Sequence, residues 1–195
     1  MARKTTISKE VILEAALTML IRDGYATINI KTLAAEIGCS TQPIVWHFEN
    51  MEGLRGALAG YAGEYAMKQA AGKQTAGKKP ANAVTQFEQM GKAYIHMAIK
   101  EPNLFKYLYL GERPLGKPFG LKGIAGQKEG REMLVGIARE TGLTEVQAAR
   151  CIQNTIFYSH GIATMVATGV FYAPEKKLLE MIHDASESFV RKERG

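Results

Sequence analysis

Closely spaced cysteines and an export signal are both missing from this sequence. Its 195 residues include two cysteines, Cys39 and Cys151, which stand far apart in the chain. The first ten residues, MARKTTISKE, contain no apolar run of signal-peptide length. Exported proteins of this size usually carry such a signal and paired cysteines. We therefore expect a protein of the reducing cytoplasm.

Long uninterrupted hydrophobic runs are also missing. The stretch from Cys151 to Pro174 has no formal charge, which makes it the best candidate for a membrane span. Polar side chains interrupt it throughout, so we expect no membrane partner. The interrupting residues are Gln153, Asn154, Thr155, Ser159, His160, Thr164 and Thr168.

Catalytic and metal-binding patterns are scarce. The four histidines are too dispersed for a metal site, and no other ligand joins them at a suitable spacing. Gly111, Gly116 and Lys117 imitate a phosphate-binding loop, but Pro118 stands where a hydroxyl would bind magnesium. We predict no catalytic residue, no metal and no cofactor, and hence a protein that is not an enzyme.

Positive charge is in excess, but it is unevenly placed. The net charge is +6 and the isoelectric point is about 9.3. Residues 1–56 contain six Lys/Arg and six Asp/Glu, so this part has no net charge. The overall charge therefore gives only weak support to a nucleic-acid partner.

Apolar residues recur with a helical period along nearly the whole chain. No stretch alternates with a period of two, so we predict an all-α fold. Ser8 and Asn29 are suited to cap the starts of two helices that end at Gly24 and Gly38. Ser40 and Asn50 are expected to cap the third and fourth helices, and further helices are expected at about 83–100, 103–110, 126–141, 144–171 and 174–192.

The short connection after Gly38 predicts a helix-turn-helix. A helix that ends at Gly38 and another that follows Ser40 leave room only for a tight corner. Such a corner can present its second helix to the major groove of DNA. Ile44 and Phe48 are four residues apart and share the buried face, which leaves Trp46 outside.

The helix-turn-helix lies within a longer run, residues 12–54, that resembles a known protein family. They read ILEAALTMLIRDGYATINIKTLAAEIGCSTQPIVWHFENMEGL. This run resembles the N-terminal domain of the TetR family over about 45 residues in register. The shared features are Ala-Ala in the first helix, Gly-Tyr before a Thr, Gly-Cys-Ser at the turn and His-Phe at the end of the reading helix.

The resemblance implies a domain order. It places a three-helix helix-turn-helix domain at 1–50 and a connecting helix at 51–70. Residues 71–82, with Gly, Pro and Lys and no large apolar side chain, are then a surface linker. A helical domain over 83–195 would bind an effector and form the dimer.

The resemblance also implies a set of DNA-contacting residues. Thr41, Gln42 and Pro43 would face base edges, while Trp46 and His47 would lie along the phosphates. Gln42 can pair with adenine, and Pro43 can pack on a thymine methyl group. The family usually has Tyr at Val45 and Lys at Met51, so affinity per half-site is expected to be modest. The full predicted set is Asn29, Lys31, Ser40, Thr41, Gln42, Pro43, Val45, Trp46 and His47.

For Trp46 and His47 there is a plainer interpretation, in which they are a packed indole and a surface imidazole. The helix-turn-helix can also be incidental to a small all-helical enzyme or ligand carrier. Steep weakening of specific DNA binding by salt would separate that alternative from a DNA-binding regulator.

The last two helices are expected to form a homodimer in the way that the family does. Small and apolar residues recur along both at helical spacing, although the same stripes could close the core of one chain. The predicted interface comprises Ala149, Ala163, Ala167, Leu178, Ile182, Ala185 and Phe189.

Aromatic residues gather in the second half of the chain, where they could enclose an apolar or aromatic effector or form plain core. His160 and Gly161 resemble a TetR subgroup that also has a Trp in this helix, which this chain lacks. The sequence thus predicts a repressor that a small-molecule effector releases from a palindromic operator in double-stranded DNA. The predicted pocket residues are Tyr94, Met97, Phe105, Tyr109, Phe157, Tyr158, His160 and Met165.

Overall fold

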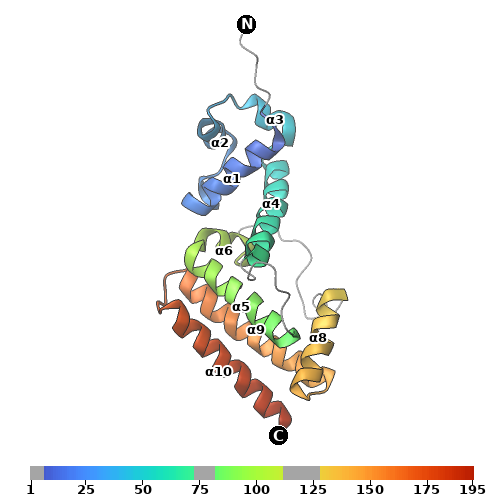
Figure 1. Ribbon diagram of the computed structural model, residues 1–195. Helices are drawn as coiled ribbons and strands as arrows, with labels where there is room; N and C mark the ends of the chain where they lie inside the picture. Colours follow the sequence, from blue (N-terminus) through green and yellow to red (C-terminus); the bar gives the residue numbers. More distant parts are fainter. Residues whose placement is uncertain (1–6, 73–81, 112–127) are drawn as a thin grey trace. The chain divides into compact units, whose positions relative to one another are not determined.

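The computed structural model describes residues 7–72, 82–111 and 128–195, and every regular element within these ranges is a helix (Figure 1). The all-α prediction is therefore confirmed. The chain divides into two compact units, one of Met1–Lys68 with Glu101–Leu115 and one of Gln69–Lys100 with Gly116–Gly195. The expected linker at 71–82 and the imitation of a phosphate-binding loop lie almost entirely outside the described residues.

The first unit contains the predicted helix-turn-helix. Its first helix packs against the next two and against the sixth, so it forms the centre of the unit. The elements are α1 (Lys9–Asp23), a 3-10 turn (Tyr25–Thr27), α2 (Ile30–Ile37), α3 (Gln42–Phe48), most of α4 (Met51–Gly72) and α6 (Pro102–Tyr109).

Local side-chain caps set the ends of α1 and α2. The Ser8 hydroxyl accepts a hydrogen bond from the Val11 amide at 3.3 Å. The Asn29 carboxamide oxygen accepts from the amides of Lys31 and Thr32 at 2.9 and 3.0 Å. Gly38 has a φ of 76°, the left-handed conformation that ends α2 at little cost for glycine. These predicted boundaries are confirmed.

The start of α3 differs from the prediction. Thr41, not Ser40, is the residue before the helix, and its side chain makes no capping hydrogen bond. Thr41 already has helical backbone angles (φ −69°, ψ −16°), whereas a capping side chain needs an extended backbone at the N-cap. The expected Ser40 cap is therefore wrong, and Pro43 in the first turn favours the start instead.

The fourth helix begins where the sequence predicted. The Asn50 carboxamide oxygen accepts hydrogen bonds from the amides of Glu52 and Gly53 at 2.9 and 3.1 Å. Gly53 itself is closely approached, because a Cβ atom added there would collide with the Phe48 carbonyl oxygen. The junction of α3 and α4 thus depends on a glycine. Farther along α4, the buried residues are Leu54, Leu58, Ala62 and Ala66.

The sixth helix belongs to the first unit, although its sequence position lies within the range 83–195 expected for the second domain. The Asn103 side-chain amide donates to the carbonyls of Ile21 and Arg22 at 3.2 and 3.3 Å. The rings of Tyr25 and Tyr107 lie 4.9 Å apart. Carbonyls at the end of α1 are therefore satisfied by a residue of α6.

The second unit is built around one long helix. In it, α9 (Glu145–Ala167) lies against α5 (Ala83–Lys100), α8 (Lys128–Thr141) and α10 (Glu175–Arg194) (Figure 1). We expected α9 to continue to about residue 171, but it ends at Ala167. The cause is Gly169, whose φ of 75° turns the chain so that the Val170 amide donates back to the Met165 carbonyl at 2.9 Å.

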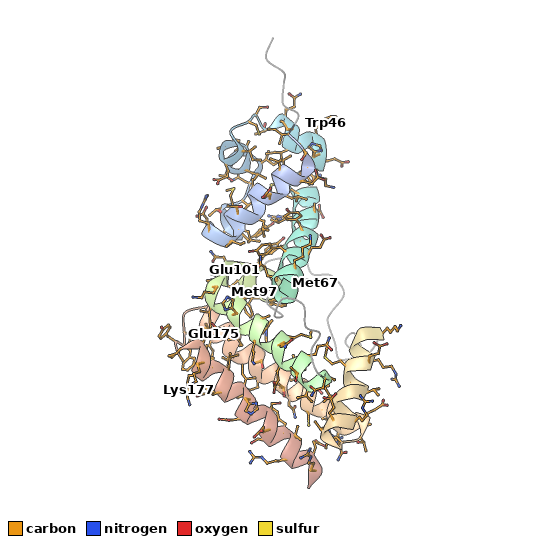
Figure 2. The ribbon with its side chains drawn as sticks, in the orientation of Figure 1. Trp46, Met67, Met97, Glu101, Glu175 and Lys177 are labelled. Carbon is orange, nitrogen blue, oxygen red and sulfur yellow. The ribbon has the colours of Figure 1, made fainter. Side chains whose placement is uncertain are left out.

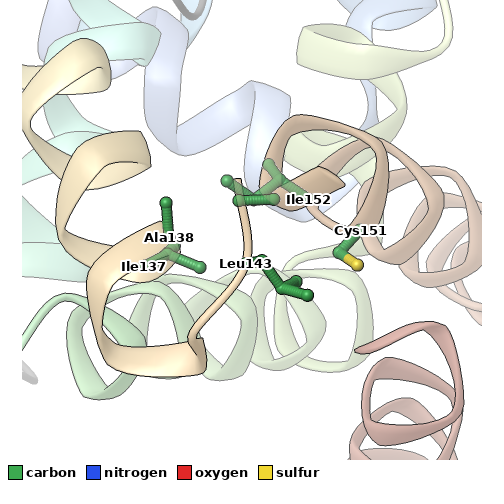
Figure 3. Packing of buried hydrophobic residues seen from close by; sticks show 6 residues of the cluster. Ile137, Ala138, Leu143, Cys151 and Ile152 are labelled. Atoms are coloured by element: carbon green, nitrogen blue, oxygen red, sulfur yellow. The ribbon is translucent and has the colours of Figure 1, made fainter. Parts of the chain in front are cut away.

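The core of the second unit is apolar where α8 meets α9. Figure 3 shows part of it, and its buried residues are Ile137, Ala138, Leu143, Ala148, Cys151 and Ile152. Burial raises the pKa of the Cys151 thiol, so this cysteine is a packed side chain of low reactivity, as a structural role requires. None of the helices in the described ranges combines the length and the apolar character that crossing a membrane demands.

Candidate nucleic-acid interface

The reading helix α3 buries one side and exposes the other. Ile44 and Phe48 are buried, as their four-residue spacing predicted. Thr41, Gln42 and Val45 are exposed. The Trp46 side chain is 74% exposed, and Figure 2 shows it at the surface of α3. An indole is rarely left so open by a single chain, so this face is suited to contact a partner.

The predicted DNA-contacting residues in and around α3 differ in their exposure to solvent. Lys31 on α2 is exposed, and so is Ser40 in the turn. Pro43 and His47 are half-buried. Asn29 uses its side-chain oxygen to cap α2, so its contribution to a phosphate site would have to come through its amide nitrogen.

His47 makes a contact that the sequence did not indicate. Its Nε2 atom lies 2.9 Å from the carbonyl oxygen of Ile7, just before α1. A carbonyl oxygen only accepts, so Nε2 carries the hydrogen and donates it. The partners are 40 residues apart in sequence, and no local pattern could have predicted the pair.

An ion pair fixes α2 against α1. The Arg22 guanidinium makes two hydrogen bonds to the Glu36 carboxylate, at 2.9 and 3.0 Å. This contact lowers the pKa of Glu36, and a hydrogen bond from Arg22 also lowers that of Asp23. The pair is exposed, so it sets geometry more than it adds stability.

The eight predicted pocket residues divide between the two units. Phe105 and Tyr109 lie on α6 in the first unit, where their ring centroids are 5.2 Å apart and Phe105 is fully buried. In the second unit the Tyr94 hydroxyl and His160 Nδ1 are 2.6 Å apart. Tyr94, Met97 and His160 are half-buried.

The aromatic residues at the middle of α9 face outward instead of inward. Phe157 is 63% exposed, and Tyr158 and Met165 are also exposed. Two open hollows of the second unit, of about 440 and 380 Å³, lie along α8 and the start of α5, and none of the eight predicted residues lines them. Helical spacing alone could not tell which face of α9 is covered.

The predicted dimer residues also separate into two groups. Ala163, Ala167 and Leu178 are buried by the chain itself, so they form its own core and are not available at a surface. Ala149, Ile182, Ala185 and Phe189 are half-buried. The residues of α9 that are open include Val146, Phe157, Gly161 and Met165.

The first unit matches a known family. Residues 12–58 match the family described as bacterial regulatory proteins, tetR family. The match begins within α1, covers α2 and α3 and ends within α4. It therefore includes the whole corner that exposes Trp46.

A curated relative agrees with that match. The chain is 37% identical over 57 residues to an uncharacterized HTH-type transcriptional regulator of Mycobacterium tuberculosis. The aligned segment covers 29% of this chain and 26% of the relative, so the chain spans about a quarter of the relative's length.

Solved structures share the fold over nearly the whole chain. TetR from Acinetobacter baumannii AYE has a TM-score of 0.62 at 14% identity, covering 95% of this chain and 98% of that one. A variant of that organism's TetR in complex with minocycline has a TM-score of 0.56 at 13% identity, covering 95% of both chains. BioQ with its natural double-stranded DNA operator has a TM-score of 0.51 at 16% identity, covering 92% of this chain and 97% of that one.

These comparisons agree with the geometry of the first unit. The family match and the relative cover the helix-turn-helix, and the solved structures share the all-helical fold beyond it. The motif around His160 and Gly161 stays a prediction. The N-terminal helix-turn-helix is thus similar to that of the tetR family of bacterial regulatory proteins over residues 12–58.

Proposed function

We propose that this protein is a DNA-binding transcriptional regulator, a dimeric repressor that a small-molecule effector releases from a palindromic operator. The observation that carries the proposal is the open face of α3, with Trp46 exposed and Ile44 and Phe48 buried, inside the segment that matches the tetR family. BioQ, which shares the fold, is described with its DNA operator.

Base recognition rests on the first turn of α3. Gln42 is exposed and can form two hydrogen bonds with an adenine edge. Thr41 can bond a base or a phosphate, and Pro43 can pack on a thymine methyl group. Lys31, Ser40 and the amide of Asn29 would contact phosphates, while Val45, Trp46 and His47 would lie along the backbone.

Dimerisation would bring two copies of α3 to adjacent turns of DNA, about 34 to 36 Å apart. We place the dimer surface on the exposed side of α9, because it carries apolar residues that a second copy could cover. This surface consists of Val146, Phe157, Gly161 and Met165. The half-buried Ala149, Ile182, Ala185 and Phe189 would border it.

The effector would bind in the second unit. The pair of Tyr94 and His160 offers a polar contact among helices rich in aromatic and methionine side chains. Met97 lies one turn along α5 from Tyr94. The complex of an Acinetobacter baumannii TetR variant with minocycline supports a small molecule as the effector, and we infer an apolar or aromatic one.

Binding of the purified protein to DNA from around its own gene tests the proposal. Fluorescence anisotropy should find a preferred fragment, bound by two copies of the chain. Its affinity should fall steeply as salt rises, because phosphate contacts release counterions. Random DNA of equal length serves as the control. Equal affinity for every fragment at low salt would refute the proposal.

A further inference from the structure

The end of α1 is bonded to two other helices of the first unit. The Asn103 side-chain amide on α6 donates to the carbonyls of Ile21 and Arg22 at 3.2 and 3.3 Å. The Arg22 guanidinium in turn donates to the Glu36 carboxylate on α2 at 2.9 and 3.0 Å. The backbone of Arg22 is therefore held by α6, while its side chain holds α2.

The carbonyls at this helix end need donors from outside α1. The helix ends at Asp23, so its last carbonyls have no helical amide one turn farther along. The Gly24 amide donates to the Leu20 carbonyl at 3.0 Å. Gly24 then leaves the helix with a φ of 86° and a ψ of 163°, and the chain turns away from the helix axis. The Asn103 amide takes the place of the helical donors that this turn removes.

This polar contact fixes a position that apolar packing alone leaves loose. Helix α6 packs against α1, but hydrophobic contact has no preferred direction. A hydrogen bond weakens steeply with distance and angle, so the Asn103 amide sets how the end of α1 lies against α6. The buried apolar residues of α6 are Leu104, Phe105, Tyr107 and Leu108.

The partner of Arg22 on α2 lies next to the reading corner. Glu36 comes two residues before Gly38, at which α2 ends. The amides of Gly38 and Cys39 donate back to carbonyls of the last turn of α2 at 3.2 and 2.9 Å. A two-pronged pair of guanidinium and carboxylate fixes orientation as well as distance. The Arg22 side chain therefore orients the turn from which the chain enters α3.

We propose that Asn103 is a positioning residue for the reading corner and that it acts through Arg22. By fixing the last turn of α1, Asn103 aims the Arg22 guanidinium at Glu36 and so holds α2 and α3 in the orientation that reads bases. The inference rests on the proposed DNA-binding function. It gives a part in base recognition to α6, which lies outside the segment 12–58 that matches the tetR family.

A double-mutant cycle on the full chain tests the route through Arg22. The variants are Asn103→Ala, Arg22→Lys and the two together, and none of them changes the net charge. Lysine keeps the charge but cannot form the two-pronged pair with Glu36. Fluorescence anisotropy on the preferred fragment measures binding. Asn103→Ala should weaken it about three- to tenfold in the wild-type chain and less than about twofold in the Arg22→Lys background.

A matched variant and random DNA separate positioning from lost stability. Asn82→Ala also removes an asparagine cap, because the Asn82 side-chain oxygen accepts from the Thr85 amide at 2.8 Å in the second unit. It should leave binding to the preferred fragment within about twofold, at a temperature where circular dichroism shows every variant folded. Asn103→Ala should change the affinity for random DNA less than about twofold, since that binding depends on phosphate contacts and not on the aim of α3.

Hydrogen exchange, measured by NMR, tests the same route without DNA. Asn103→Ala should speed exchange of the Gly24 amide at the end of α1 at least about threefold, because the last turn loses its outside donor. It should also speed exchange of the Gly38 and Cys39 amides when Arg22 is present, and not in the Arg22→Lys background. A loss confined to α1 would leave those two amides of α2 unchanged.

The possible results are distinct. If the wild-type chain binds no fragment preferentially, the proposed function fails, and exchange of the Gly38 and Cys39 amides still decides whether Asn103 acts on α2. If Asn103→Ala weakens binding by the same factor in both Arg22 backgrounds, the route through Arg22 is refuted. An equal loss on preferred and random DNA, or an equal loss for Asn82→Ala, would reduce the effect of Asn103 to stability and also refute the positioning role.

Discussion

The reading corner of the first unit is held largely by short-range contacts, whereas the long helices of the second unit are joined by residues far apart in the chain. Asn29 and Thr32 form a reciprocal cap three residues apart, and Gly38 ends α2 by its own conformation. In the second unit, Tyr94 meets His160 and His96 meets Glu175, across 66 and 79 residues. The caps of the reading corner are therefore specified by neighbouring residues in the sequence. The contacts of the second unit form only when its helices pack together.

This difference has a consequence for substitutions. In the reading corner, a change should act through the conformation of a few neighbouring residues. In the second unit, a change should act through the packing between helices. The predictions below test how far that contrast holds. The first concerns Phe105, which was predicted to line a pocket and is buried in the core.

The largest expected effect is at Phe105, which the sequence predicted as a pocket residue and the structure buries completely. Phe105→Ala should lower the free energy of unfolding by about 3 to 5 kcal/mol, because it leaves a cavity. Tyr109→Ala, at a residue 43% exposed on the same helix, should cost under about 1 kcal/mol. Urea unfolding measures both. Unchanged stability with a lost effector response would restore the pocket interpretation.

The second prediction tests the local character of the reading corner. Gly53→Ala should destabilise the chain by more than about 2 kcal/mol, because the new Cβ would collide with the Phe48 carbonyl oxygen. Gly56→Ala, in the same helix with nothing within 4 Å of the new atom, should stabilise it by about 0.5 to 1 kcal/mol. Thermal unfolding compares the two, and equal shifts would show that the α3–α4 junction adapts.

A third prediction separates recognition from stability within α3. Gln42→Ala should cost about 1 to 3 kcal/mol of specific DNA binding and relax the preference at one base pair. Folding should be unchanged, since the side chain is exposed. Lys31→Ala is the matched control, expected to weaken operator and random DNA alike. A parallel loss on both DNAs for Gln42→Ala would contradict base reading by this residue.

The smallest expected effect concerns a contact between helices of the second unit. The Glu140 carboxylate accepts hydrogen bonds from the amides of Ala83 and Val84 at 2.9 and 3.0 Å, and these bonds lower its pKa below the ordinary value of 4.5. The stability that the Glu140 carboxylate adds to the folded chain is therefore present above pH 4.5 and is lost as the pH falls through the lowered pKa.

Glu140→Gln should accordingly destabilise the chain near neutral pH and have less effect in acid. Urea unfolding at several pH values measures the difference between variant and wild type. Glu132→Gln, which removes an exposed carboxylate from the same helix, serves as the control for the lost charge. If Glu140→Gln lowers the free energy of unfolding by the same amount at every pH, loss of the carboxylate cap is not the cause of the destabilisation.

The sequence predicted most helix ends of the reading corner because their determinants are local, whereas it did not place α6 in this unit. The caps at Ser8, Asn29 and Asn50 use side chains within three residues of the amides they bind. The buried pair of Ile44 and Phe48 followed from their spacing alone. The Ser40 cap failed because a suitable residue type does not fix the backbone angles that capping requires.

The pocket and dimer residues could not be predicted in the same way. Helical periodicity shows that Ala163 and Phe157 lie on different faces of α9, but it does not say which face the chain covers. That depends on the positions of α5, α8 and α10, which only the folded chain defines. The exposure of Phe157 and the burial of Ala163 and Leu178 are both consequences of that packing.

Trp46 is the single tryptophan of the chain, and it stands on the face of α3 that is open to a partner. The tryptophan fluorescence of the protein is therefore emitted from the reading helix alone, with no background from other indoles. A water-exposed indole that becomes covered by nucleic acid should change in intensity and emission wavelength. When tryptophan is excited selectively, the protein thus carries its own optical reporter of occupancy, which requires no label.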